Sequence, residues 1–367
     1  MTSSHLAFPL FALLITGCAA EPTGPAEPDD LATASADLAV SRVGGAGPGF
    51  LFGGAAGSVA AQRGDLTASG VAASLASRSS FDGTDGNVDS AGHIQDIVDR
   101  IACDARSGIT ANIALHAPGQ GAAQSFHDWG SDRAWIAGLD ALAAKLKAVK
   151  QADGSPQPVY IRYGKEFNQR WVPAHDGKPA TCVDWLSAAA DFHHRDCAAE
   201  LFWQWRQVRA AFASAPNVKL VWCPTGQADV SAATAHPGAA NPDELWPGAD
   251  QVDVIGPDAY NGKRRENAAP AGAFGDFVAL ADAANKPFLI SETGIVQGAP
   301  YIDASWYSDL FAYLASVEQH GVDVLGVAGF WRDTDFGDTT LRPAQGAQLE
   351  AILRAQPQRS QACVAQE

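Results

Sequence analysis

The sequence predicts an α/β fold in which strand–helix units repeat until eight parallel strands close on one another. Two observations favour this fold. Short apolar runs alternate with amphipathic segments through most of the 367 residues, and polar or aromatic residues follow the apolar runs, as they do at the C-terminal ends of parallel strands. The composition agrees, since 47% of the residues are apolar and only 18% are charged, which suits a large buried core.

The expected elements alternate along the chain. The best defined is the helix 132–150, where Trp135, Leu139, Leu142 and Leu146 share a face. Ser131 or Asp132 can cap its first turn. The expected strands are 49–53, 69–75, 109–116, the run from 159, 218–223, 252–256, the run from 286, and 324–330; the other expected helices are 94–105, 201–213, 274–284, 303–317 and 343–354. Such units in one domain fit a (β/α)8 TIM barrel. A doubly wound open sheet is the alternative, and it would require a glycine-rich phosphate loop that the early strands lack.

The chain divides into three expected parts. Residues 1–18 contain a short apolar run that ends in Ile15-Thr-Gly-Cys18 and resembles a bacterial lipoprotein signal peptide, whose cleavage would leave Cys18 as the lipidated N-terminus. No Lys or Arg precedes that run, and an ordinary secretory signal is the alternative; both imply export. Residues 19–46 are rich in Ala, Pro, Gly and acidic residues and predict a disordered tether. Residues 47–367 form the expected barrel domain.

Charge and motifs restrict the partners and cofactors. The formal net charge is −16 and no basic run occurs, which argues against nucleic acid or an anionic membrane as a partner. Contact with a membrane is therefore expected only through the lipid anchor, and we expect a monomer. The sequence has no CxxC or HExxH spacing, so neither a metal nor another cofactor is expected.

Export makes disulfides possible. Cys182 and Cys197 flank one loop region and are the first expected pair. Cys103 and Cys363 could join an early helix to the C-terminal region, which a closed barrel would bring together. Cys223 lies in an apolar strand and predicts a buried thiol.

Two expected strands end in a glutamate. The first leads to Glu166, with Arg162 before it and Asn168 and Trp171 after it, and the second delivers Glu292 at the same relative place. If these are the fourth and seventh strands, both side chains reach the mouth of the barrel. Paired carboxylates are the machinery of glycoside hydrolysis, and retention of configuration requires the two carboxyl groups to lie about 5–5.5 Å apart, which is the separation we predict.

The same stretches resemble glycoside hydrolase family 26, the β-mannanase family of clan A. The matching blocks are Arg162-Tyr-Gly-Lys-Glu166-Phe-Asn168-Gln-Arg-Trp171, the segment 245–261 and Lys286-Pro-Phe-Leu-Ile-Ser-Glu292-Thr-Gly, within a match that covers about residues 90–335. The resemblance implies a (β/α)8 barrel and retaining hydrolysis of a β-linked polysaccharide, with Glu166 as acid/base and Glu292 as nucleophile. It also implies that Tyr260 hydrogen-bonds the nucleophile, and that Trp171 and Trp331 form a sugar platform.

One position departs from the family pattern. Lys165 stands where the family typically has His, and a cation beside a general acid lowers the pKa of that acid. The lysine could instead bind a substrate hydroxyl or an acidic sugar.

Further candidates carry two interpretations each. His116 ends a strand and could reach the substrate, or it is a core histidine. Asp258 lines the mouth of the barrel or caps the turn after Pro257. Trp246, like Trp171 and Trp331, follows a strand-like run where a flat ring could stack on a sugar.

The leading hypothesis is an exported, endo-acting retaining β-glycosidase with β-1,4-mannan as substrate and polysaccharides or oligosaccharides as its binding partners. A hydrolase of the same chemistry could act instead on β-glucan, β-1,3-xylan or an acidic polysaccharide. The competing hypothesis is a non-catalytic carbohydrate-binding lipoprotein on the same barrel, which would bind sugar without turnover.

Overall fold

A computed structural model describes the parts of the chain that build the barrel wall. The described residues are 38–43, 50–53, 77–81, 88, 90–106, 110–115, 132–164, 167, 171–172, 181–182, 194–225, 245–261, 269–295, 305–329, 333–334, 337–338 and 343–355.

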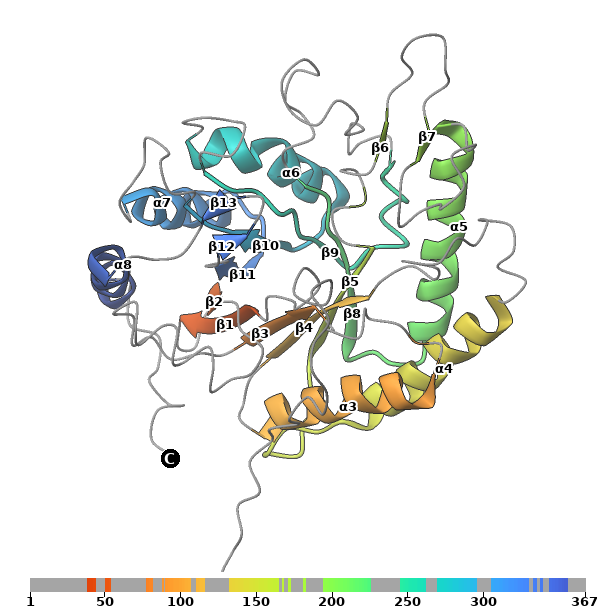
Figure 1. Ribbon diagram of the computed structural model, residues 1–367. Helices are drawn as coiled ribbons and strands as arrows, with labels where there is room; N and C mark the ends of the chain where they lie inside the picture. Colours follow the sequence, from red (N-terminus) through yellow and green to blue (C-terminus); the bar gives the residue numbers. More distant parts are fainter. Residues whose placement is uncertain are drawn as a thin grey trace, which may run out of the picture.

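The main sheet closes into a barrel with the strand order β1-β2-β11-β10-β9-β8-β5-β4-β3. Its strands are β1 (Leu38–Val43), β2 (Phe50–Gly53), β3 (Ser77–Phe81), β4 (Thr110–Leu115), β5 (Val159–Tyr163), β8 (Val218–Trp222), β9 (Val254–Ile255), β10 (Phe288–Thr293) and β11 (Val324–Gly329). From β3 through β4, β5, β8, β9, β10 and β11 to β2 every pairing is parallel, while β1 is antiparallel to both β2 and β3. The predicted α/β class with parallel strands is confirmed (Figure 1).

Helices flank this sheet on its outer side (Figure 1). Those among the described residues are α3 (Ala91–Arg106), α4 (Asp132–Ala148), α5 (His194–Phe212), α6 (Pro270–Ala284), α7 (Ser305–Gln319) and α8 (Pro343–Ala355). Two small antiparallel pairs accompany them, β6 (Trp171–Val172) with β7 (Thr181–Cys182) and β12 (Asp333–Thr334) with β13 (Gly337–Asp338). No helix in the described ranges is long and apolar enough to cross a membrane.

The N-terminal part of the barrel differs from the expectation in two places. Strand β1 falls inside the segment 19–46 that was predicted to be a tether, so strand structure of the barrel includes residues before the predicted domain boundary at residue 47. The described second parallel strand is Ser77–Phe81, whereas the expected run 69–75 lies outside the described residues. Strand β3 is polar apart from Phe81, and β1 follows a segment rich in Ala, Pro and acidic residues. Pairing with distant strands therefore defines both strands more than their local pattern does.

Alternation along each strand separates the inside of the barrel from its outer wall. On β5, Ile161 and Tyr163 belong to the large core beneath the helices, and the Tyr163 ring centroid lies 5.9 Å from that of Trp205 on α5. The intervening residue Arg162 points the other way, because successive side chains of a strand alternate. An inner cluster is formed by Val221, Cys223, Val254 and Leu289, all buried.

The inner cluster leaves little space. A Cβ on Gly256 would lie 2.4 Å from Val221 Cγ1 and 2.6 Å from Ser291 Oγ, so only glycine fits there. Cys223 is a buried thiol, as predicted.

Candidate active site

Arg162 is the cation at the centre of the candidate site. It lies on β5 at an inward-facing position, and its side chain has no exposed surface. Sequence reasoning expected this residue to bind substrate. Its complete burial contradicts that expectation and indicates that the guanidinium acts on neighbouring carboxylates.

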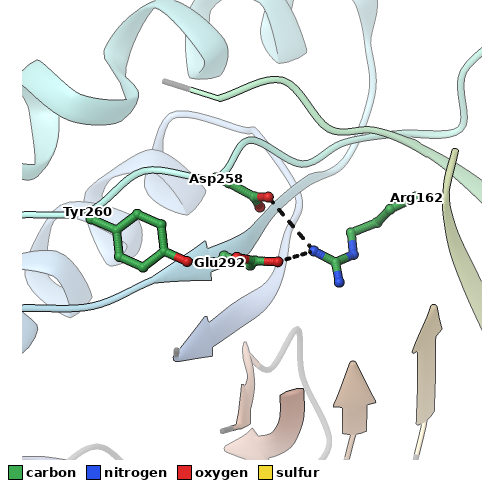
Figure 2. Close-up of polar contacts among 4 residues, drawn as sticks. All are labelled: Arg162, Asp258, Tyr260 and Glu292. Atoms are coloured by element: carbon green, nitrogen blue, oxygen red, sulfur yellow. Dashed lines mark hydrogen bonds and ion pairs between the residues drawn. The ribbon is translucent and has the colours of Figure 1, made fainter. Parts of the chain in front are cut away.

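Glu292 is the first of those carboxylates. It is the fifth residue of β10, where that strand reaches its C-terminal end, and it is 3% exposed. Arg162 Nη1 donates to Glu292 Oε1 at 2.8 Å, and the Tyr260 hydroxyl donates to Oε2 at 2.6 Å (Figure 2). Each carboxylate oxygen therefore has its own donor, and the plane of the carboxylate is held from two sides.

Asp258 is the second carboxylate beside Arg162. Its Oδ2 lies 3.8 Å from Arg162 Nη1, and its side chain is fully buried (Figure 2). Two isolated parallel β-bridges hold its backbone, one to Glu292 and one to Thr225. Of the two roles considered from the sequence, the structure supports a place in the site over a turn cap alone.

The carboxylates around Arg162 keep its guanidinium protonated. Burial lowers the pKa of Arg162, but the negative charge of Glu292 beside it, together with that of Asp258, more than offsets this, and the pKa ends well above its ordinary value. The guanidinium therefore keeps its charge at every working pH. In return it stabilises the ionised form of Glu292, as a cation within hydrogen-bond distance does for any carboxylate.

Tyr260 lies where the family resemblance implies, with its hydroxyl on Glu292. It follows β9 on an extended segment, and the neighbouring Ala259 donates its backbone N–H to the Glu292 carbonyl at 3.0 Å. Tyr260 and Asp258 are two residues apart, and both side chains reach the same group, Tyr260 on Glu292 and Asp258 beside Arg162.

Several predicted site residues fall outside the part of the chain that the structure describes. They are His116, Lys165, Glu166, Asn168 and Trp331. Trp171 belongs to β6, but its side chain is also outside the description. The roles predicted for all of these residues stay predictions.

Trp246 is placed on the outer wall of the barrel. Its ring meets that of Trp222 edge to face, with the centroids 5.1 Å apart, and it lines a shallow hollow with Asp276, Ala279 and Leu280 of α6. Trp222 itself faces outward, because it packs on Phe277 of α6. The expectation that Trp246 stacks on substrate at the mouth is therefore corrected: it packs between the sheet and α6.

The predicted disulfides stay predictions as well. Cys182 lies on β7, which packs against α5, the helix that contains Cys197, but neither side chain is among those described. The Cys103 side chain and the whole of Cys363 lie outside the description too, as does Cys18. Within the described ranges, no group of three or more His, Cys, Asp or Glu side chains could hold a metal ion.

Comparison with known proteins gives a likeness at the level of structure. No protein-family model and no curated protein matches the sequence. Among solved structures, a GH26 β-mannanase from Bacteroides ovatus, BoMan26A, matches with a TM-score of 0.52 at 14% identity, over 81% of this chain and 83% of that one. The YdhT protein from Bacillus subtilis matches with a TM-score of 0.52 at 14% identity, over 86% of each chain.

A third similar structure is longer. The endo-β-1,4-mannanase double mutant from Cellulomonas fimi matches with a TM-score of 0.49 at 19% identity, and this chain spans 73% of its own length but only 59% of that protein. At such identities a structural match speaks for the fold alone. The protein has the fold of the glycoside hydrolase family 26 β-mannanases.

Proposed function

We propose that the protein is a retaining, endo-acting β-glycosidase that hydrolyses a β-linked polysaccharide, with β-1,4-mannan as its substrate. The observation that carries the proposal is the state of Glu292. It lies at the C-terminal end of a parallel strand, with Arg162 bonded to one carboxylate oxygen and Tyr260 to the other. A nucleophilic carboxylate must be ionised and correctly oriented, and these two donors favour both.

In the proposed reaction, a carboxylate oxygen of Glu292 attacks the anomeric carbon while the bond to the leaving oxygen breaks. Glu166 gives its proton to that leaving oxygen. Water then attacks the covalent glycosyl-enzyme, Glu166 takes the proton from the water, and Glu292 leaves as a free carboxylate. Two displacements at one carbon retain its configuration.

Three features support Glu166 as the acid/base. It follows β5 by three residues, and β5 is the fourth parallel strand in chain order, while β10 is the seventh. Barrel strands carry catalytic residues at their C-terminal ends. The pairing order puts β8 and β9 between β5 and β10, so the C-terminal ends of β5 and β10 belong to the same mouth of the barrel.

The choice of β-mannan rests on the fold, because BoMan26A is described as a GH26 β-mannanase. We also propose the regular (β/α)8 arrangement of that family for the whole domain, with β1 as an addition between β2 and β3. Trp171 and Trp331 would form the sugar platform, Asn168 would bind a substrate hydroxyl, and His116 would lie near them. Lys165 favours a second candidate substrate, an acidic polysaccharide, because it adds a cation next to the acid/base.

A panel of polysaccharides scored for new reducing ends tests the function. The panel contains β-mannan, β-glucan, β-1,3-xylan and an acidic polysaccharide, and NMR of the first product identifies its anomeric configuration. We expect β-mannan to be cleaved into oligosaccharides with retention, and Glu292→Ala and Glu166→Ala to abolish cleavage. Binding of mannan without turnover, with an affinity that Glu292→Ala leaves unchanged, would favour a non-catalytic sugar-binding protein.

Export and lipidation are part of the proposal. The segment 1–18 supports a lipoprotein signal peptide whose cleavage leaves Cys18 as the lipidated first residue, so we propose that the mature protein is held on the cell envelope by its lipid. Metabolic labelling with radioactive palmitate should mark the wild-type protein and not Cys18→Ser. Label in neither protein, with both found in the medium, would indicate an ordinary secretory signal.

A further inference from the structure

The residue after Glu292 makes a buried hydrogen bond that neither the sequence reasoning nor the proposed reaction uses. Thr293 is fully buried, and its Oγ1 donates to the Ala259 carbonyl at 2.7 Å. In the opposite direction, the Ala259 N–H donates to the Glu292 carbonyl at 3.0 Å. Residues 292 and 293 are thus tied to residue 259 by two bonds, one of them from a side chain.

These bonds close a ring through the site. Ala259 precedes Tyr260, and the Tyr260 hydroxyl returns to Glu292 Oε2 at 2.6 Å. The ring runs from Glu292 to Thr293 along the chain, across to Ala259, along the chain to Tyr260, and back to Glu292. Anything that shifts Ala259 against Thr293 therefore moves the tyrosine hydroxyl away from the carboxylate.

The side-chain bond lies where the regular pairing of β9 with β10 has given way to isolated bridges, Asp258 with Glu292 and Asn261 with Ile295. Strand β9 is only two residues long, and its regular pairing with β10 is limited to Phe288 with Ile255. The pairing of β10 with β11 also changes register between Ile290 and Thr293. Backbone bonds continue beyond the regular ladder, from Ser291 N–H to the Pro257 carbonyl at 3.1 Å and from Asn261 N–H to the Gly294 carbonyl at 3.0 Å. The Thr293 hydroxyl adds a side-chain bond between these two backbone bonds, at the Ala259 carbonyl.

We propose that Thr293 is a positioning residue, which holds the Tyr260 hydroxyl on Glu292 by fixing the end of β9 against the end of β10. Its kinetic consequences rest on the proposed function, but the geometric claim does not. The alternative is that the hydroxyl only satisfies a buried carbonyl, in which case its loss would lower stability without acting through Tyr260.

Thr293→Val removes the hydroxyl and keeps the shape of the side chain. We expect kcat/KM on mannohexaose to fall by about tenfold, since small displacements of a reacting group cost up to about 100-fold. The acid limb of the pH profile of kcat/KM should move to higher pH, because a carboxylate that loses a hydrogen-bond donor is protonated more easily. Thr293→Ser, which restores the donor, should recover most of the lost activity.

Coupling to Tyr260 separates positioning from a purely structural role. In the Tyr260→Phe background the hydroxyl that Thr293 positions is already absent, so Thr293→Val should then change kcat/KM and the acid limb very little. Ser316→Ala is the matched control, because Ser316 Oγ also donates to a backbone carbonyl at 2.7 Å, that of Tyr313 on α7. It should leave the pH profile as in the wild type.

Two results would overturn the proposal: effects of Thr293→Val and Tyr260→Phe that simply multiply, or an unchanged acid limb in Thr293→Val. A wild-type protein that cleaves no polysaccharide would refute the proposed function but not this inference. The carboxyl resonance of Glu292 in 13C-glutamate-labelled protein, assigned with Glu292→Gln, then decides it. Thr293→Val should move its titration to higher pH when Tyr260 is present and not in Tyr260→Phe; equal behaviour in both backgrounds would refute the positioning role.

Discussion

The Tyr260 hydroxyl and the Glu292 carboxylate form a 2.6 Å hydrogen bond on the oxygen opposite the one that Arg162 binds. The two donors come from different strands, β5 and the segment after β9, and they meet at a residue of β10 (Figure 2). This convergence of three strands on one carboxylate is the structural basis of the proposed nucleophile.

Removing the tyrosine hydroxyl tests its part in that arrangement. Tyr260→Phe should lower kcat/KM on β-mannan by about 10–100-fold, as expected for the loss of one hydrogen bond to a charged group. The ring remains, so stability should change little. Steady-state kinetics and thermal unfolding measure the two effects, and a protein with wild-type kinetics would show that the bond has no role in catalysis.

Replacing Arg162 tests how much the buried cation contributes to stability beside Glu292 and Asp258. Arg162→Met leaves the Glu292 and Asp258 carboxylates buried without their cation, and breaking a buried pair in this way costs about 3–5 kcal/mol. The matched control is Arg209→Met, because the pair of Arg209 with Asp253 is partly exposed, with 37% of the arginine side chain accessible. Exposed pairs contribute about 1 kcal/mol or less. Urea unfolding compares the variants, and equal losses would contradict the central position of Arg162.

Gly256 tests the packing inside the barrel. Gly256→Ala places a methyl group against Val221 and Ser291 at distances that no Cβ adopts, so it should destabilise the protein by about 1–3 kcal/mol. Gly275→Ala is the control, because the position is helical and no atom lies within 4 Å of the added Cβ. It should stabilise the helix by about 0.5–1 kcal/mol. Chemical denaturation gives both values; stabilisation by Gly256→Ala would mean that the interior is open.

Replacing Trp246 tests whether this side chain packs on the outer wall of the barrel and not on the substrate. Trp246→Ala removes the ring that packs on Trp222 beside α6, so it should lower the free energy of unfolding. The kinetics on β-mannan should remain those of the wild type. A raised KM with unchanged stability would return this tryptophan to the substrate path.

Patterns within one strand were predictable from the sequence. The runs that became β5, β8, β10 and β11 have enough apolar residues to be recognised locally, and Glu292 follows from its place at the end of such a run. Tyr260 required the family resemblance, because no local pattern joins residue 260 to residue 292.

What the sequence did not reveal depends on contacts between distant segments. Strand β1 exists through its pairing with β2 and β3, and its own residues looked like part of a tether. The burial of Arg162 could have been inferred, because it alternates with the outward-facing residues of an apolar strand. Its ion pair with Glu292 could not, because that residue comes from the distant strand β10. Trp246 looked like a site residue because it follows a strand-like run, whereas its position is decided by Trp222 and α6.

Covalent trapping of the nucleophile tests the central claim most directly. A 2-deoxy-2-fluoro-β-mannoside with a dinitrophenolate leaving group should form a glycosyl-enzyme that hydrolyses slowly. Mass spectrometry of the intact protein should show one added sugar, and the labelled peptide should contain Glu292. A label on another residue, or turnover with inversion and no label, would contradict the account.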